Sequence, residues 1–257
     1  MPSFKRFTRF SPALFVIMSI GLSATPAIAW DWSWGTKVAG SGNIKTETRA
    51  VSGFTGIALG VPAKAEIIQS GNEGISIESD DNILPLIETV VDDGKLKIRF
   101  KDRSMSVSTK TLKLTINVKT LDSLSVAGSG DLVAAKLQVA KLKTSVAGSG
   151  DVRIAALDAD ALTLSIAGSG DFSAGGKANT VEARIAGSGN VKIEKLAANN
   201  VKVSIAGSGD ARVWAKETLT ISVAGSGDVV YFGDARVTQS VAGSGTVKRL
   251  GNAPAGG

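Results

Sequence analysis

A six-residue motif, Val-Ala-Gly-Ser-Gly-Asp, recurs through the second half of this chain and constrains its fold more than any other feature. Its Gly-Ser-Gly cores are spaced 20, 20, 19, 20, 18 and 18 residues apart, and an eighth copy stands alone at 38–43. The seven spaced cores lie at 128–130, 148–150, 168–170, 187–189, 207–209, 225–227 and 243–245. A repeat of this regularity predicts an architecture made by stacking one structural unit.

Each repeat has the two-residue alternation of a strand with one buried face. A β-branched residue precedes the Ala in every copy, a polar residue usually comes before it, and an apolar residue follows the position after the glycines. A unit of this length is too short for a βαβ unit of about 30 residues or a propeller blade of about 40. We therefore predict an all-β fold, a right-handed parallel β-helix (β-solenoid) with about 18–20 residues per coil.

An antiparallel meander that closes into a sandwich or barrel is the alternative fold. Successive identical corners would then lie at alternate ends of the sheet, unless each repeat held a complete hairpin. In a solenoid all the corners lie in one row, and the paired glycines allow neighbouring corners to approach closely.

The N-terminus has the features of a secretory signal peptide. Lys5, Arg6 and Arg9 precede an apolar run at 13–22 and a small-x-small site, so we predict that residues 1–29 are removed. The apolar run is too short to anchor the chain in a bilayer. We expect an exported protein that is not integral to the membrane and that resides in the periplasm, at the cell surface or outside the cell.

The composition excludes several classes of function. The chain has no histidine and no cysteine, which excludes zinc sites and nucleophiles activated by either residue. Loss of the signal peptide leaves 26 basic and 23 acidic side chains, a net charge of +3, and no basic run carries interleaved aromatic residues. We therefore expect no nucleic-acid partner. We assign no catalytic, cofactor-binding or metal-binding residue, and no cofactor.

The rest of the chain divides into four segments. Residues 30–43 are rich in tryptophan, and Trp30, Trp32 and Trp34 either cap an open end of the helix or form a platform for a sugar, a membrane interface or a partner. Residues 44–120 form an N-terminal β region that is continuous with the solenoid, with a short helical turn at 82–87 and a loop at 102–111. Residues 121–250 form the repeat β-helix, and residues 251–257 a disordered tail.

The acidic residues after the corners form the most suggestive cluster, because stacking would align them in a column. Carboxylates about 5 Å apart repel by about 1 kcal/mol even in water. Calcium between coils is one way to offset this repulsion. The other, which we favour, combines turn-forming aspartates with the basic residues Arg153, Lys192, Arg212 and Lys248. The column consists of Asp131, Asp151, Asp171, Asn190, Asp210 and Asp228.

Two other sets of residues have both a structural and a functional interpretation. Ser129, Ser149 and their equivalents lie between glycines, but seven copies without a histidine or a nucleophile elbow favour a ladder of hydroxyl groups over a catalytic serine. Trp214 and Phe232 occupy equivalent places in adjacent coils. We expect a packed aromatic step there, and a sugar-stacking site is the alternative.

The order of motifs along the chain resembles a known family. Gly53-Phe54-Thr55-Gly56-Ile57, then Asp80-Asp81-Asn82-Ile83-Leu84, then Asp93-Gly94-Lys95-Leu96-Lys97-Ile98 and the Ala-Gly-Ser-Gly-Asp corners are similar to the bacterial head GIN domain family, whose members are labelled putative auto-transporter adhesins. The resemblance extends from about 40 to 250. It implies an exported, β-helical, non-enzymatic protein, and it brings no catalytic residues.

These observations lead to one preferred function and two alternatives. We expect an exported, non-enzymatic, adhesin-like binding or structural protein that presents a repetitive surface to a cell-envelope, glycan or protein partner, with self-association through the solenoid ends. The main alternative is a polysaccharide-active β-helix enzyme, such as a calcium-dependent lyase. Such an enzyme would interrupt its repeat with a long loop at the active site, and no such insertion occurs. An accessory role in an envelope-stress operon is the third idea.

Overall fold

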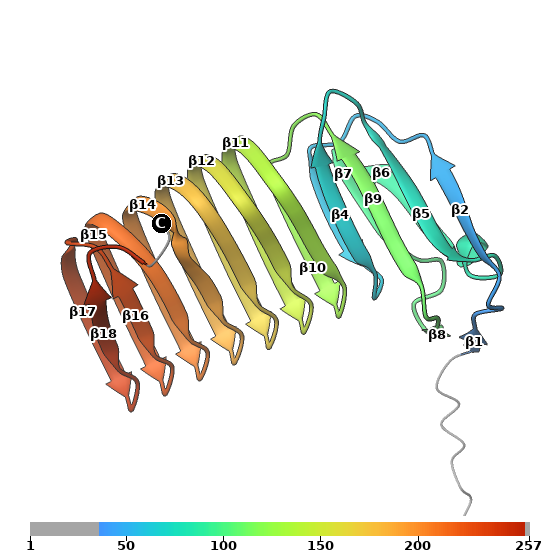
Figure 1. The fold of residues 1–257 in the computed structure, drawn as a ribbon. Coiled ribbons are helices and arrows are strands. Elements are labelled where there is room, and N and C mark those ends of the chain that lie inside the picture. Colours follow the sequence, from blue (N-terminus) through green and yellow to red (C-terminus); the bar gives the residue numbers. More distant parts are fainter. Residues whose placement is uncertain (1–35, 255–257) are drawn as a thin grey trace, which may run out of the picture. The chain divides into compact units, whose positions relative to one another are not determined.

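In the computed structural model, which describes residues 36–254, the repeats stack as coils of a parallel β-solenoid (Figure 1). The predicted signal peptide and Trp30, Trp32 and Trp34 lie outside the described residues. Each long strand pairs in parallel with the next, in chain order, from β10 to β15. The predicted parallel β-solenoid is thereby confirmed. These strands are β10 (Ser123–Gly128), β11 (Asp131–Gly148), β12 (Val152–Gly168), β13 (Phe172–Gly187), β14 (Val191–Gly207) and β15 (Ala211–Gly225).

The last coil consists of two shorter strands, β16 (Val229–Phe232) and β17 (Arg236–Gly243), and a further strand, β18 (Val247–Gly251), stacks on β16 beyond it. Both β16 and β17 pair with β15, and β18 pairs with β16. Gly251, expected to open a disordered tail, instead closes β18, where its carbonyl oxygen accepts the N–H of Gly233 at 2.9 Å.

The coils are aligned at their glycine corners. Gly128, Gly148 and Gly168 are direct register partners, and the same alignment continues to Gly243. The shorter coils lose residues elsewhere, because the register shifts occur after the first few residues of a coil, for example between Ile154 and Leu157. The corner therefore fixes the register, and the other sides of the coil absorb the change in repeat length.

Both glycines of a corner are required by packing against the preceding coil. Gly148 has a φ of +123°, and a Cβ on it would lie 2.5 Å from the carbonyl oxygen of Gly128. A Cβ on Gly150 would overlap the carbonyl oxygen of Gly130. The Gly128 carbonyl accepts the N–H groups of both Ser149 and Gly150, each at 2.9 Å. The serine side chain between the glycines stays exposed.

The core lies inside the coils and consists of apolar columns. The β-branched residue before each corner alanine is buried in every coil up to Val223, which is 2% exposed. The same position in the last coil, Val241, is 39% exposed because no further coil covers it. Each coil is therefore stabilised by its neighbours, because the apolar side chain at one position packs against the equivalent side chain of the next coil.

The N-terminal region extends the solenoid and then changes strand direction. β3 (Gly56–Gly60) pairs in parallel with β10, and β4 (Lys64–Gln69) with β11. β7 (Lys95–Phe100) pairs in parallel with β3, and β9 (Leu112–Val118) with β4. Three antiparallel pairings follow, of β2 with β5, β5 with β9 and β6 with β7. These strands are β2 (Ile44–Arg49), β5 (Gly74–Asp80) and β6 (Ile87–Asp92).

Three small elements complete this region. The 3-10 helix η1 (Leu84–Leu86) falls within the short helical turn expected at 82–87. β1 (Lys37–Ala39) pairs in parallel with β8 (Ser106–Ser108), which lies inside the segment expected to be a loop at 102–111. In the described part of the chain, no helix is long and apolar enough to cross a membrane.

Candidate functional site

The acidic column predicted from the sequence forms, and it is a ladder of hydrogen bonds between coils. Asp151 Oδ1 accepts the backbone N–H of Asp171 at 2.9 Å, and Asp210 Oδ1 accepts that of Asp228, also at 2.9 Å. Asn190 Oδ1 accepts the N–H of Asp210 at 3.3 Å, so the amide fits the same position. At the end of the ladder, Asp228 Oδ1 accepts both the N–H and the hydroxyl of Thr246, which lowers the Asp228 pKa below its ordinary value.

The predicted basic partners form half of the expected ion pairs. Arg153 Nη2 lies 2.5 Å from Asp151 Oδ2, and Lys192 Nζ lies 2.6 Å from Asp171 Oδ2. Partial burial raises the Asp171 pKa, but the hydrogen bonds from Lys192 and Asn190 outweigh it, and the net pKa is lowered. Among the described residues, Arg212 and Lys248 form no ion pair with the column.

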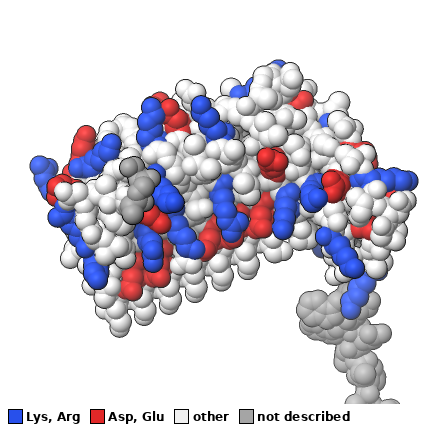
Figure 2. Space-filling view, in the orientation of Figure 1, with Lys and Arg blue, Asp and Glu red and all other residues white. Residues whose placement is uncertain are grey.

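Hydrogen bonds and ion pairs account for the column without a metal. One oxygen of each acidic side chain is directed at a backbone N–H rather than at a shared point between coils. Within residues 36–254, no three acidic side chains converge closely enough to hold an ion. The column is therefore best described as part of the corner structure. Figure 2 shows that charges of both signs gather in bands on the coils, while the row of Gly-Ser-Gly residues along the lower edge is uncharged.

The other two predicted sets also stack between coils. The corner serines are exposed, and their backbone N–H groups take part in the corner bonds described above. Trp214 and Phe232 are direct register partners in adjacent coils, as predicted, and both are half-buried. Lys216 Nζ lies 5.9 Å from the centre of the Trp214 ring.

The isolated motif copy at 38–43 has a different structural role. Its Ser41 hydroxyl donates to Asp81 Oδ1 at 2.6 Å, and its Gly42 N–H donates to Asp80 Oδ1 at 2.6 Å. Asp80 is only 3% exposed and also accepts the Thr109 hydroxyl. These bonds fasten the N-terminal strands to the end of β5, so this copy is a structural contact rather than a coil corner.

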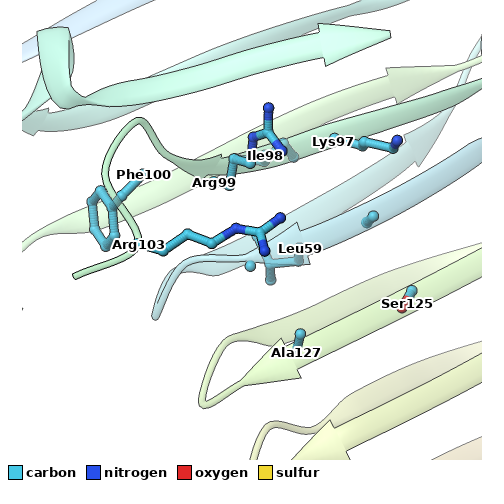
Figure 3. Close-up of a pocket in the computed structure, with 10 residues that line it drawn as sticks. Leu59, Lys97, Ile98, Arg99, Phe100, Arg103, Ser125 and Ala127 are labelled. Carbon is cyan, nitrogen blue, oxygen red and sulfur yellow. The ribbon is translucent and has the colours of Figure 1, made fainter. Parts of the chain in front are cut away.

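A cleft that the sequence analysis did not single out lies where β7 and β3 meet β10 (Figure 3). Its volume is about 560 Å³. Lys97, Arg99 and Arg103 supply its charged side, and Phe100 lies at one end. The rest of the lining is mostly small residues of β3 and β10, namely Ala58, Gly60, Ser125 and Ala127. We call this site the basic cleft.

Strand register places the basic residues beside small ones. Lys97 is the register partner of Ala58, and Ala58 is the partner of Ser125. Arg99 is the partner of Gly60 in the same way. Figure 3 shows Arg103 extending from the turn after β7 toward Leu59. The small neighbours leave the charged groups open to a ligand that lies over β3 and β10.

Two carboxylates of β6 partly balance this charge. Lys97 donates a hydrogen bond to Asp92, which holds the Asp92 pKa below its ordinary value and keeps the carboxylate ionised at neutral pH. Arg99 Nε donates to Glu88 Oε2 at 2.7 Å. Three cations and two carboxylates leave a local excess of positive charge. The alternation in Lys95-Leu96-Lys97-Ile98-Arg99-Phe100 indicated that Lys97 and Arg99 share a face, but the sequence did not indicate that Arg103 joins them.

Comparison with known proteins shows which family the chain belongs to. The family profile described as "Putative auto-transporter adhesin, head GIN domain" matches residues 53–235. The chain belongs to the head GIN domain family. This GIN domain contains the basic cleft and most of the solenoid, and the resemblance inferred from the motifs is confirmed.

Solved structures share the fold of this GIN domain protein. A "putative adhesin" from Bacteroides fragilis is 29% identical with a TM-score of 0.77, and the match covers 83% of this chain and 100% of that one. A "Putative lipid binding protein" from Parabacteroides distasonis is 26% identical with a TM-score of 0.73, covering 84% and 100%. A "putative adhesin" from Parabacteroides merdae, 24% identical with a TM-score of 0.70 and covering 84% and 100%, shares the fold. No curated protein matches this chain.

Proposed function

We propose that this GIN domain protein is an exported, non-enzymatic binding protein that presents one side of its solenoid to a partner in the cell envelope or outside the cell. The observation that carries the proposal is a regular surface that runs in register from the basic cleft to the last coil, with Arg184 in place of one serine. An adhesin-like role fits the family and the neighbouring structures called adhesins. The signal-peptide features at 1–29 support export.

This surface, which we call the Ser/Ala face, consists of two adjacent columns in strict register. One is a column of serines with a single arginine, and the other is a column of exposed alanines. Apart from the exposed Arg184, these side chains are small and leave a flat surface on which a partner can approach the sheet closely. The columns are Ser125, Ser145, Ser165, Arg184, Ser204, Ser222 and Ser240, and Ala127, Ala147, Ala167, Ala186, Ala206, Ala224 and Ala242.

The coils themselves support a binding role over catalysis. Successive corners are separated by 18–20 residues throughout, so no long loop interrupts the repeat to enclose an active site. The corner carboxylates are engaged in hydrogen bonds with the neighbouring coil. Adhesion through a repetitive surface needs none of the general acids, bases or metals that a lyase requires.

The test measures binding of the purified mature chain to isolated cell envelopes and to a glycan array. Ala167→Lys places a long charged side chain in the middle of the Ser/Ala face, and we expect it to weaken binding. Ala156→Lys makes the same change at an exposed position in the same coil but outside this face, and it serves as the matched control. Equal binding by the two variants and the parent chain would contradict the use of this face.

Export of the protein is tested by a separate measurement. Mass spectrometry of the protein recovered from fractionated cells should find a mature N-terminus at Trp30 in the periplasmic, surface or medium fraction. A protein that keeps residues 1–29 and stays in the cytoplasm would overturn the exported role.

A further inference from the structure

We propose that the basic cleft binds the carboxylate or sulfate groups of an acidic polysaccharide. This inference rests on the proposed binding function and names the ligand class of one site beside the Ser/Ala face. Three observations support it: hydrogen-bond donors without partners among the described residues, an excess of positive charge, and a shallow lining of small residues that is open along the coils.

The cleft contains donors that the described residues do not satisfy. Arg99 donates to Glu88 through Nε, and its two Nη atoms donate to no acceptor within residues 36–254. In the same part of the chain, neither the Arg103 guanidinium nor the Ser125 hydroxyl has a hydrogen-bond partner or an ion-pair partner. Two guanidinium groups and a hydroxyl that border one cleft are suited to a carboxylate or sulfate group, because arginine can bind such anions through two parallel hydrogen bonds.

The charges that face the cleft favour an anion as the ligand. The facing carboxylates, Glu88 and Asp92, belong to β6, which lies on the side of β7 away from β3 and β10. They pair with Arg99 and Lys97 from that outer side. An anion that lies over β3 therefore meets the basic groups first. Arg103 carries a charge that no carboxylate of the described residues neutralises.

The shape and lining favour a polysaccharide over a membrane. A membrane-binding site would place exposed large apolar residues at its centre, but none of those among residues 36–254 lines the cleft. These are Ile44, Ile68, Val90, Val133, Val241 and Leu250. Instead, Ser125 and Ala127 lead from the cleft directly into the serine and alanine columns. An extended hydroxyl-rich chain can lie along these columns while its acidic group occupies the cleft, and the half-buried Phe100 ring at the cleft end can stack on a sugar face.

The experiment measures binding of the mature protein to polygalacturonate, a carboxylated chain, and to dextran sulfate, with neutral dextran as the uncharged probe. We expect salt-dependent binding to at least one acidic chain and none to dextran. The double variant R99Q/R103Q should weaken that binding by at least about tenfold, since each change removes a charge-assisted contact. The control Arg212→Gln removes an exposed arginine elsewhere and should stay within about twofold, since it touches no cleft residue.

A second variant separates contact in the cleft from a general loss of charge. Ala127→Phe keeps every charge and fills the cleft beside Gly60, so we expect it to weaken binding to the acidic chain as well. Circular dichroism melts confirm that each variant is folded. Unchanged affinity in both R99Q/R103Q and Ala127→Phe would overturn the assignment.

Two further binding experiments distinguish a failure of this inference from a failure of the proposed function. Binding to vesicles of phosphatidylglycerol and phosphatidylcholine, without binding to either acidic polysaccharide, would overturn the inference in favour of a membrane surface. Binding of envelopes or neutral glycans that R99Q/R103Q leaves intact would also overturn it, while the proposed function would stand. Absence of binding in every arm would overturn both.

Discussion

The carboxylate of Asp151 accepts a hydrogen bond from the backbone N–H of Asp171, the equivalent residue one coil later, at 2.9 Å. The same bond recurs between successive coils, with Asn190 as one acceptor and Thr246 as the last donor. A side chain that follows a glycine corner thus satisfies a backbone group that the parallel ladder leaves free at the turn. Repulsion within the column is reduced because the acceptor oxygens face N–H dipoles.

Asp151→Ala should destabilise the protein by about 1–2 kcal/mol, because it removes the acceptor for one backbone N–H and the partner of Arg153. Asp151→Asn keeps the acceptor oxygen, as Asn190 does naturally, and should cost less than about 0.5 kcal/mol. Urea denaturation of both variants checks the difference. Equal losses would show that charge, and not the inter-coil hydrogen bond, stabilises the corner.

Calcium should not change the thermal stability of the mature protein. The Oδ1 atoms of the column already accept backbone N–H groups, and no three described acidic side chains converge on one point. A ligand that binds only the folded state raises the melting temperature by mass action, so a melt in calcium and one in chelator give the answer directly. A saturable rise in calcium, abolished in Asp151→Asn, would restore the metal interpretation of the column.

Gly150→Ala should cost at least about 2 kcal/mol, since the new Cβ overlaps the carbonyl oxygen of Gly130 and the backbone on both sides is fixed by the ladder. Gly71 serves as a control, because a Cβ there meets no atom within 4 Å. We expect Gly71→Ala to change the stability by less than about 0.5 kcal/mol. Differential scanning calorimetry compares the two. A mild effect at Gly150 would mean that neighbouring coils can separate at the corner.

Most of the fold could be predicted from the sequence, because the repeated motif shows directly that one structural unit is stacked. Fixed spacing, paired glycines and alternation with a β-branched residue leave few architectures, and the register of Val126 on Val146 follows from them. The change to antiparallel pairing in the N-terminal region was not predicted, because the strands there carry no repeated marker of direction. The pairing of β2 and β9 with β5 depends on contacts between residues distant in sequence.

Among the candidate sites too, those built by the repeat could be predicted and the one outside it could not. The positions of Asp131, Trp214 and Phe232 follow from the repeat, so their stacking could be predicted. The basic cleft joins Arg103, from a turn, to Ser125, on a strand of the first coil, and only the folded chain brings them together. The repeat therefore predicts the stacked columns, whereas the cleft forms where the repeat meets the N-terminal β region.

Acid should weaken the contacts that hold the 38–43 motif to the end of β5. The hydrogen bonds from Thr109 and from the Gly42 N–H hold the Asp80 pKa below its ordinary value of 3.8, and those from Ser41 and Asn43 do the same for Asp81. A lowered pKa in the folded state stabilises the protein above pH 3.8, and this contribution is lost as the pH falls through the lower folded pKa.

Melting curves recorded below about pH 5 test this prediction, since the ordinary range of aspartate pKa values lies below it. In Asp80→Asn the decline of stability with acid should be shallower than in the parent chain. Asp160→Asn is the control, because its exposed carboxylate accepts no hydrogen bond from the described residues. The same acid dependence in both variants would contradict a role for the contacts between the 38–43 motif and Asp80.

The last coil presents an open strand edge. β17 pairs with β15 along one edge, and no described strand covers the other. Val241 is 39% exposed, whereas its register partner Val223 is 2% exposed under the coil above it. An open edge of this kind is a template for another strand. The terminal coil of a second copy has the same outline and the same apolar column, so we propose that two chains associate end to end through β17.

Val241→Lys should therefore make the mature protein monomeric, because a charge at the exposed edge opposes burial against a second copy. Ser222→Lys adds the same charge one coil away from the edge and should leave the self-association of the parent chain unchanged. Sedimentation velocity over a range of protein concentrations measures the association directly, and circular dichroism verifies that both variants fold. A parent chain that sediments as a monomer at every concentration would show that the last coil of the mature protein is stable without a partner copy.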